Sequence, residues 1–146
     1  MEVSNPEKIM SRLLTDQLLG VLATQNNGQP YTNLVAFAAS ENFKYLLFVT
    51  PKFTRKYSNL SLSQEASLMV DNRSNTVSDF KDATVLNAMG KVEEIDKDPE
   101  MITLYLAKHP YLSSFLKNPS SALMKFQVEK YIVATSFQNV VEIDML

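Results

Sequence analysis

The sequence contains no cysteine and a single histidine, His109. Without cysteine, the chain has no thiolate nucleophile, no disulfide bond and no cysteine-ligated zinc or iron–sulfur centre. With one histidine, a Ser-His-Asp triad or a two-histidine metal site within one chain has to use that residue or cannot form. The acidic run KVEEIDKDPE is interpreted as a solvated strand face followed by a helix cap, rather than as an acid–base pair or a metal site. The residue inventory therefore gives little support to hydrolytic or metal chemistry carried by side chains alone.

His109 lies in the segment AKHPY, directly before Pro110, where a helix must stop. We expect it to end a helix and to interact with the terminal carbonyl groups of that helix, rather than to act as a metal ligand or a base. The aromatic and apolar residues near it are expected to pack in a core or at a dimer interface: Tyr105, Leu106, Tyr111, Leu112 and Phe115.

Neither sign of charge dominates the sequence. The formal net charge of −2 argues against a protein that binds the phosphate backbone of nucleic acid, which calls for a basic face. No apolar run approaches the ~20 residues that span a bilayer, and residues 1–12 contain no charged-then-apolar leader, so a cytoplasmic location is expected, with no membrane partner. The hydrophobic content of 45% is that of a globular protein, and the 146 residues are expected to form one domain, residues 1–146.

Seven segments have the composition of β-strands. An Asn-Gly turn at residues 27–28 joins the first two as a hairpin. Gly90, inside a long strand, indicates a bulge or a close backbone approach. The segments are residues 20–25, 31–39, 45–50, 66–72, 83–95, 122–137 and 140–145. Strands of this number and order commonly close into an antiparallel barrel, which removes their exposed edges.

Helices are expected between several of these strands. Asn5 and Asp98 each precede a proline at a first helical position, as N-cap residues do. In the second helix, Phe53, Tyr57 and Leu60 are expected on one face. The predicted helices are residues 6–18, 53–64, 98–109 and 111–117, and the polar stretch 73–82 is expected to be a loop.

The segment LLFVTPKFTRKYSNL places Lys52, Arg55 and Lys56 around the start of the second helix. The first turn of a helix exposes unpaired N–H groups and the positive end of the helix dipole, so its favoured residues are Asp and Glu, not cations. If Thr54 caps this helix, the N–H groups and two of the cations converge beside Thr50, which suits a phosphate group. A solvated basic turn explains the same pattern, and the charges alone leave both interpretations open.

The order and spacing of several short motifs resemble the pyridoxamine 5′-phosphate oxidase-like, FMN-binding split-barrel superfamily. The motifs are a G-x-P at Gly28, a third strand that ends at Thr50, the Thr-Arg-Lys at 54–56, the sequence NL…ASLMVDN, and a long strand that contains a glycine. The resemblance extends from about Leu13 to the C-terminus and is most specific between Gly28 and Asn72. It implies a mainly β fold, a six- to seven-stranded antiparallel split β-barrel with short flanking helices, and non-covalent FMN as the cofactor.

The resemblance also implies which residues hold the cofactor. Backbone groups of the second strand line the flavin ring, the end of the third strand contacts the ribityl and phosphate groups, an Arg-Lys pair holds the phosphate, and the end of the fourth strand turns toward the cofactor or the partner subunit. In that order, the residues are Asn33, Leu34, Val35 and Ala36; Val49 and Thr50; Arg55 and Lys56, with Lys52 and Thr54 beside them; and Asn72 and Arg73. The family is typically a homodimer with two FMN sites, each built from both chains.

The chain differs from the vitamin B6 oxidase itself at the positions that bind the substrate phosphate. That enzyme has an arginine where this chain has Asn33, a lysine where it has Ala38, and a basic segment where this chain ends in SFQNVVEIDML. Oxidation of pyridoxamine phosphate is therefore not expected, whereas these differences do not affect the expectation of FMN binding.

The resemblance thus implies a flavin oxidoreductase in which FMN performs hydride or electron transfer and no side-chain acid or base is required. Substrate contacts are expected from the loop Arg73–Asp82 and from apolar residues near the ring. One alternative is an FMN-binding module for electron transfer or flavin storage, without a substrate. Another is a relative that binds haem or a deazaflavin: haem would use His109 as its axial ligand, and the acidic tail of a deazaflavin would need more cations than this sequence offers.

Overall fold

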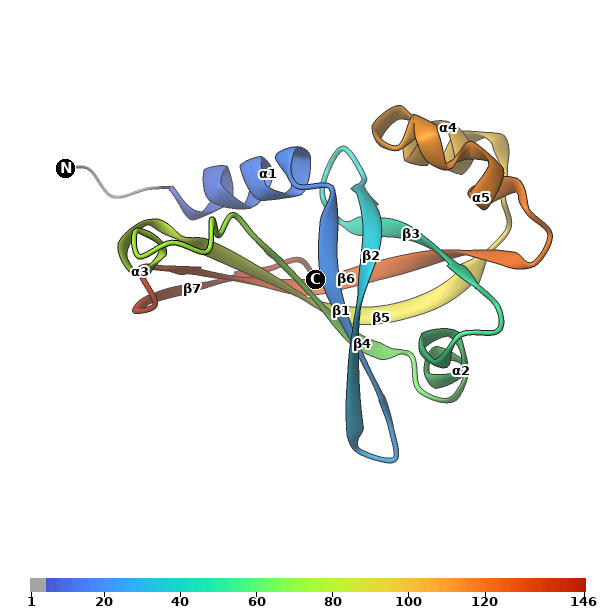
Figure 1. Cartoon of the computed structure of the whole chain (residues 1–146), viewed down its shortest axis with the longest axis horizontal. Helices are drawn as coiled ribbons and strands as arrows, with labels where there is room; N and C mark the ends of the chain where they lie inside the picture. Colours follow the sequence, from blue (N-terminus) through green and yellow to red (C-terminus); the bar gives the residue numbers. More distant parts are fainter. Residues whose placement is uncertain (1–4) are drawn as a thin grey trace.

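The computed structural model describes residues 5–146, whose strands form one sheet that closes on itself (Figure 1). Residues 1–4, the start of the segment in which no leader is expected, lie outside this range. The strands are β1 Leu19–Asn26, β2 Gln29–Ala39, β3 Tyr45–Pro51, β4 Glu65–Asp71, β5 Thr84–Ile95, β6 Ser121–Thr135 and β7 Asn139–Asp144. The helices are α1 Pro6–Asp16, α2 Arg55–Leu62, α3 Asp79–Asp82, α4 Pro99–Lys108 and α5 Ser113–Lys117, with a 3₁₀ turn at Pro110–Leu112. Within residues 5–146, no helix is long and apolar enough to cross a membrane.

The barrel closes because β6 pairs with strands that are far apart in the sequence. The strand order is β3-β2-β1-β4-β5-β6-β7, and residues 121–127 of β6 also pair antiparallel with β3. The strand is 15 residues long, so its second half extends beyond this pairing and carries β7 on the same edge as β3, opposite β5 (Figure 1). The predicted fold class is confirmed: six antiparallel strands form the barrel, and β7 is an outer strand.

The turn between β1 and β2 has the backbone geometry that its Asn-Gly sequence predicts. Asn27 and Gly28 both have positive φ angles, 51° and 83°, as a two-residue type I′ turn requires. The backbone N–H of Gly28 donates a hydrogen bond to the Gln25 side chain (2.8 Å). The predicted hairpin is therefore confirmed, with Asn26 opposite Gln29 in the ladder.

Alternation along the strands divides the apolar residues between the inside and the outside of the barrel. In β3, Leu46 and Phe48 belong to the inner core, whereas Leu47 and Val49 belong to a second cluster on the outer face. Residues from α4 and α5 cover this outer cluster, so β3 is apolar on both faces. The buried members of the outer cluster are Ala38, Leu47, Val49, Tyr105, Leu116 and Leu123.

Gly90 marks a β-bulge, as its position in the sequence predicts. The register between β5 and β6 shifts between Met89 and Gly90. A Cβ atom at Gly90 would lie only 2.0 Å from the backbone carbonyl oxygen of Gln127 on the neighbouring strand. Because that obstacle is backbone, the close approach requires glycine.

Side chains cap the three helices for which caps are predicted. Asn5 accepts a hydrogen bond from the N–H of Glu7 (2.9 Å) at the start of α1. Asp98 accepts one from the N–H of Met101 (3.0 Å) at the start of α4. Thr54 caps α2, although its hydrogen bond from the Tyr57 N–H is longer, at 3.4 Å.

Some local expectations are wrong. Helix α1 ends at Asp16, two residues before the predicted end. Phe53 precedes α2 and is 83% exposed, so it does not share a buried helical face with Leu60. Tyr111 is 99% exposed and lies outside the apolar cluster expected around it. Within the predicted loop 73–82, Asp79–Asp82 form one helical turn.

Replacement of Gly90 by alanine is expected to destabilise the barrel by about 2–4 kcal/mol, because the strands must separate to admit the methyl group. Urea unfolding measures the loss. The matched variant is Gly28→Ala, where φ is positive but the space around the Cβ position is open, so a smaller cost of about 1 kcal/mol is expected. Equal losses in the two variants would contradict the close approach at the bulge.

Candidate functional site

The chain leaves the barrel at the end of β3 through a turn that its own side chains hold together. Pro51 pairs with Ser121 of β6, and beyond it the N–H of Lys52 donates to Ser120 O (2.9 Å). The Thr54 hydroxyl donates a hydrogen bond to Pro51 O (2.9 Å). The hydroxyl of Thr50, a fully buried residue, lies 3.0 Å from the Thr54 hydroxyl. These bonds fix the turn from which α2 starts.

Thr50 and Thr54 were predicted to lie at the cofactor phosphate, with Thr54 as the cap of the helix. Their hydroxyls contact each other and Pro51 O, and Thr54 accepts the N–H of Tyr57 as the predicted cap. Their observed role is to set the position and direction of the first turn of α2.

The first turn of α2 carries positive charge and no acidic residue. The side chain of Lys56 is partly buried, and this burial lowers its pKa. The guanidinium of Arg55 lies 5.5 Å from the centre of the Tyr31 ring, which is a cation–π distance. Both cations therefore have defined positions beside the free N–H groups and the positive dipole end of the helix.

Glu94 of β5 offsets one of the positive charges at this end of the barrel. Its carboxylate lies 3.7 Å from the Lys52 amine and accepts a hydrogen bond of 2.6 Å from the Tyr57 hydroxyl. It is therefore not a purely solvated residue, in contrast to the prediction for the acidic run. Lys52, Arg55 and Lys56 carry three positive charges and Glu94 one negative charge, a net charge of about +2 for these four residues. Lys97 has a pKa lowered mainly by burial, and it lies close enough for Lys52 and Glu94 to affect this pKa as well. The excess of positive charge suits a dianionic phosphate monoester.

Beside Lys52, Arg55 and Lys56, which we call the cation cluster, part of the β2 edge that faces β3 has no neighbouring strand. Pairing of β2 with β3 is confined to residues 37–39, whereas residues 29–36 of β2 pair with β1 alone. Figure 1 shows the two strands diverging from this point, with α2 in the connection after β3. The predicted flavin-lining residues, Asn33, Leu34, Val35 and Ala36, lie on this unpaired edge. The arrangement agrees with a role for their backbone groups rather than their side chains.

The side chains of these β2 residues have different surroundings. Val35 points into the inner core, whereas Leu34 is 63% exposed on the outer face. The carbonyl of Ala36 accepts a hydrogen bond from the Tyr105 hydroxyl of α4 (2.9 Å). One backbone acceptor of β2 is therefore already hydrogen-bonded within the protein.

Asn33 has a buried side-chain oxygen, Oδ1, without a hydrogen-bond partner among the described residues. Buried polar atoms nearly always have a partner, and an isolated exception calls for a water, an ion or a ligand. Asn33 lies two residues from Tyr31, the residue beneath the Arg55 guanidinium. The cations fit the phosphate of a cofactor, and the unpartnered Oδ1 beside the open strand edge calls for a hydrogen-bond donor.

The other predicted site residues do not join this cluster in one chain. The Val49 side chain packs in the outer cluster at 5% exposure, so only its backbone remains for a ligand. Asn72 and Arg73 follow β4 at the opposite end of the barrel. Val85 pairs with Asp71 there, and the nine steps along β5 from Val85 to Glu94 extend about 30 Å at roughly 3.3 Å each.

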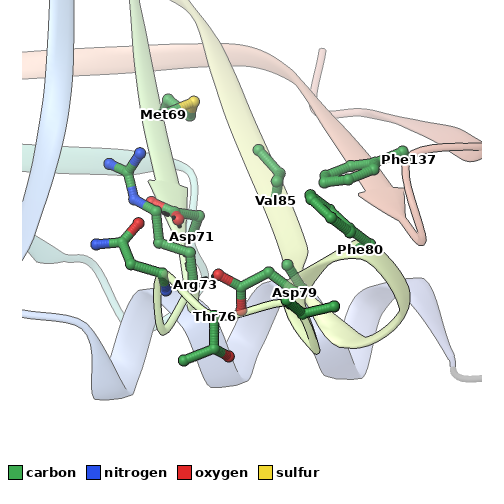
Figure 2. A pocket seen from close by; sticks show the side chains of 11 residues that line it. Met69, Asp71, Arg73, Thr76, Asp79, Phe80, Val85 and Phe137 are labelled. Carbon is green, nitrogen blue, oxygen red and sulfur yellow. Dashed lines mark hydrogen bonds and ion pairs between the residues drawn. The ribbon is translucent and has the colours of Figure 1, made fainter.

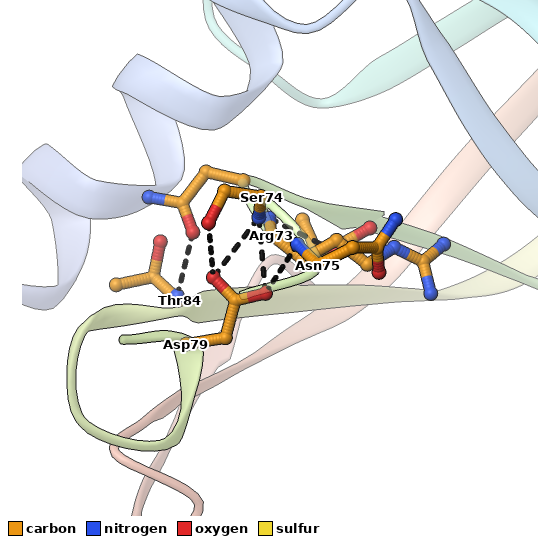
Figure 3. Close-up of polar contacts among 7 residues, drawn as sticks. Arg73, Ser74, Asn75, Asp79 and Thr84 are labelled. Carbon is orange, nitrogen blue, oxygen red and sulfur yellow. Dashed lines mark hydrogen bonds and ion pairs between the residues drawn. The ribbon is translucent and has the colours of Figure 1, made fainter. Parts of the chain in front are cut away.

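At that opposite end, the loop 72–83 is held by its own side chains (Figure 3). Asn72 accepts the Thr84 N–H (2.8 Å), and Arg73 pairs with Asp71 (3.0 Å). Asp79 accepts hydrogen bonds from the N–H groups of Ser74 and Asn75, and the Ser74 bond is the largest cause of its lowered pKa. These contacts give the loop a defined shape.

The sequence did not predict the cavity of about 660 Å³ beside this loop (Figure 2). The Phe80 and Phe137 rings lie 6.1 Å apart at its edge, and the Ser136 hydroxyl donates to Lys81 O (2.8 Å) to join their two loops. Ser136 and Phe137 have positive φ angles, which non-glycine residues rarely adopt, so their sequence did not indicate this turn. The residues that line the cavity are Met69, Asp71, Arg73, Asn75, Thr76, Val77, Asp79, Phe80, Ala83, Val85 and Phe137.

His109 ends α4 as predicted, and its backbone N–H donates to the Tyr105 carbonyl in the last turn of that helix (3.0 Å). Its side chain has a partner that was not predicted: the Nε2 atom lies 2.6 Å from the carbonyl oxygen of Phe37 on β2. The side chain is 7% exposed, and burial is the main cause of its lowered pKa. His109 is therefore a structural residue that joins α4 to the barrel. Within residues 5–146, no group of three or more His, Asp or Glu side chains is placed to hold a metal ion.

The fold and the site together define a six-stranded split barrel with a basic helix start between β3 and β4. A sequence profile of the family described as pyridoxamine 5′-phosphate oxidase matches residues 7–133. The chain belongs to this family, the pyridoxamine 5′-phosphate oxidase-like split-barrel proteins, as its motifs predicted.

Solved structures with the same fold include proteins with different cofactors. A FAD-binding protein from Mesorhizobium loti is 18% identical, with a TM-score of 0.69 and coverage of 90% of this chain and 92% of that one. A heme-binding protein from Mycobacterium smegmatis is 11% identical, with a TM-score of 0.84; this chain is covered over 99% of its length and spans 60% of that protein. A NimC/NimA family protein from Clostridium acetobutylicum is 14% identical, with a TM-score of 0.69 and coverage of 93% and 92%. No curated protein matches the sequence.

Replacement of His109 by glutamine is expected to remove an acid-induced loss of stability. The pKa of the folded histidine lies below its ordinary value of 6.5, so the unfolded chain takes up the proton first. Stability is therefore fully present above about pH 6.5 and falls as the pH decreases toward the folded pKa. Urea unfolding from pH 7.5 to 5 measures how the free energy of unfolding depends on pH in the wild type and in His109→Gln. An equal pH dependence in the two proteins would contradict the assignment.

Replacement of His109 by phenylalanine leaves the Phe37 carbonyl unpaired, so His109→Phe is expected to be less stable than the wild type at every pH.

Proposed function

We propose that the protein is an FMN-binding flavoprotein that transfers hydride or electrons to a small-molecule acceptor. The observation that carries the proposal is the first turn of α2, where two cations stand in place of the acidic residues that a helix start favours. The phosphate of FMN supplies the missing negative charge. The buried, unpartnered Oδ1 of Asn33, beside the open edge of β2, is an acceptor, and an N–H or O–H group of the bound FMN would supply its donor.

Within this proposal the residues have distinct tasks. Arg55, Lys56 and the first N–H groups of α2 bind the phosphate, and the backbone edge of β2 orients the flavin ring. FMN supplies the redox chemistry when it is bound. The protein supplies binding, orientation and exclusion of water, so this function requires no side-chain acid–base pair.

We further propose that the functional unit is a homodimer. The outer face of β2, β1 and β4 is apolar, with Leu34, Val21 and Met69 side by side in register and Leu34 largely exposed. Monomers rarely leave such a face uncovered. A twofold axis through this face would bring the cation cluster of one chain toward the opposite end of the partner's barrel, where the 660 Å³ cavity and Arg73 lie. This arrangement would account for a site whose predicted residues are about 30 Å apart in one chain.

The apolar lining of that cavity supports an uncharged or weakly polar acceptor. Pyridoxamine phosphate is not supported as the substrate, because Asn33 and Ala38 replace the two cations of the oxidase. Ala38 is also 2% exposed in the outer cluster that α4 and α5 cover. The absence of cysteine agrees with a cytoplasmic, reducing environment.

Two alternatives differ from this proposal in what they bind or do. An FMN-binding module without a substrate would hold FMN equally well but would show no turnover with any acceptor. Haem binding, known for the relative from Mycobacterium smegmatis, would require an axial ligand. His109 does not serve as that ligand in this fold, because it is buried and hydrogen-bonded to the Phe37 carbonyl.

The double variant Arg55→Ala/Lys56→Ala is expected to weaken FMN binding at least about 100-fold. Each charge-assisted hydrogen bond to a phosphate contributes roughly 1.5–3 kcal/mol, and two are lost. Titration of apo protein, followed by quenching of FMN fluorescence, measures the affinity. Lys117→Ala, at the exposed end of α5, is the matched control and is expected to bind FMN normally. An unchanged affinity in the double variant, with an unchanged melting temperature, would exclude this phosphate site.

Replacement of Glu94 by glutamine is expected to change FMN affinity in the opposite direction. Removal of the carboxylate leaves the Lys52 charge without its partner, so the phosphate should bind about two- to fivefold more tightly. The gain should disappear at high salt, because Glu94 and Lys52 are both exposed to solvent. The same titration at low and high ionic strength tests this. Weaker binding by Glu94→Gln would indicate instead that the Tyr57–Glu94 hydrogen bond is what positions α2.

A further inference from the structure

A separate cavity of about 520 Å³ lies between α1, α4 and the turn that joins β2 to β3. In Figure 1 this turn lies between the end of α1 and α4, away from α2. Its walls are mainly apolar, and the only cation that lines it is Lys108. The lining residues are Leu14, Thr15, Ala38, Ala39, Ser40, Glu41, Phe43, Leu104, Ala107 and Lys108.

Lys108 is the last residue of α4 and one of the residues that line this cavity. The amine donates a hydrogen bond to the carbonyl oxygen of Leu14 in α1 (2.9 Å) and lies 3.8 Å from the centre of the Phe37 ring. Among the described residues, no carboxylate lies within 4.0 Å of it. Lys108 therefore differs from a surface lysine in having a fixed, half-buried amine without an acidic partner.

The charged groups around the amine come from three elements. Asp16 at the end of α1 favours the ammonium form, and His109 is the next residue of the chain. Glu41, in the β2–β3 turn, lines the same cavity. Burial outweighs the effect of Asp16 and lowers the pKa of Lys108 to about 8. Relative to an ordinary lysine, this shift gives roughly 300-fold more neutral amine at neutral pH.

We propose that Lys108 and its cavity form a binding site for small apolar aldehydes, which Lys108 holds as a Schiff base. The amine nitrogen attacks the carbonyl carbon and forms the C–N bond. The carbonyl oxygen leaves as water with the two hydrogens of the neutral amine, so the condensation requires no oxidant or reductant. It is reversible, and it does not depend on a flavin at α2.

The lining of the cavity determines the class of aldehyde. Leu14, Ala39 and Phe43 offer apolar contacts, and the Phe37 ring lies beside the reacting nitrogen. Glu41 is the carboxylate that lines the cavity, so it disfavours an aldehyde that carries a negative charge. An uncharged aromatic aldehyde of the size of benzaldehyde fits these walls, whereas glyoxylate does not.

Reductive trapping on the purified full-length chain tests this site. Benzaldehyde at a low molar ratio is added with cyanoborohydride between pH 6.5 and 10, and the modified lysine is identified by peptide mass mapping. Lys125 provides the comparison, because its amine also lies over an aromatic ring, 4.5 Å from the centre of Tyr45. At pH 7.5 we expect Lys108 to be modified at least about tenfold faster than Lys125, with the rate rising through about pH 8.

The variants Lys108→Arg and Lys125→Arg separate this site from general lysine chemistry. Arginine preserves a cation and a donor for Leu14 O, and an unchanged melting temperature shows that the variant folds. Loss of the rapid modification in Lys108→Arg, and its retention in Lys125→Arg, would support the site. Modification spread evenly over the lysines, or rapid modification that persists in Lys108→Arg, would overturn it. Equal trapping of glyoxylate and benzaldehyde at Lys108 would overturn the assignment to apolar aldehydes.

Discussion

The pairing of β3 with β6 is the constraint on which the rest of the structure depends. This ladder runs from Tyr45 opposite Gln127 to Pro51 opposite Ser121, and it closes the barrel between strands that are about 75 residues apart in the sequence. Because β3 follows β6, it diverges from β2 after three paired residues and leaves an open edge on β2. The same pairing fixes where β3 ends. The chain must then turn back to reach β4, and α2 forms in that connection with its N-terminus at the mouth of the split.

In the proposed function, the electrostatics of this helix start connect the fold to phosphate binding. A helix N-terminus with Arg55 and Lys56 is locally unfavourable, because cations repel the positive end of the helix dipole. Proteins accept such local costs mainly at functional sites, where a ligand reverses the sign of the interaction. Here the negative charge of Glu94 offsets the positive charge of Lys52. The positive charges of Arg55 and Lys56 remain, and a phosphate monoester would neutralise them. A heme-binding and a FAD-binding protein share this fold at 11% and 18% identity, so the fold alone does not identify a cofactor.

The sequence predicted the strands, the Asn-Gly hairpin, the bulge at Gly90 and the caps at Asn5, Thr54 and Asp98, because these features depend on local chemistry. It did not predict contacts that depend on distant segments. The bond of His109 to Phe37, the contact of Glu94 with α2 and the burial of Thr50 all require knowledge of which strands are neighbours. The cavity beside Phe80 and Phe137 was missed for the same reason, since two separate loops form it. For the site, the motifs identified the basic helix start, but spacing alone could not reveal that Asn72 and Arg73 lie at the other end of the barrel.

The most direct test of the central claim, that the basic start of α2 holds the phosphate of FMN, is the visible absorption spectrum of the freshly purified protein. Denaturation and mass analysis of the released chromophore identify the bound group, and addition of FMN to any apo fraction shows whether the site can be filled. The proposal predicts a flavin spectrum, with FMN released in up to one equivalent per chain. A haem spectrum, or a colourless protein that does not bind added FMN, would contradict it and leave Lys52, Arg55 and Lys56 as a solvated basic turn.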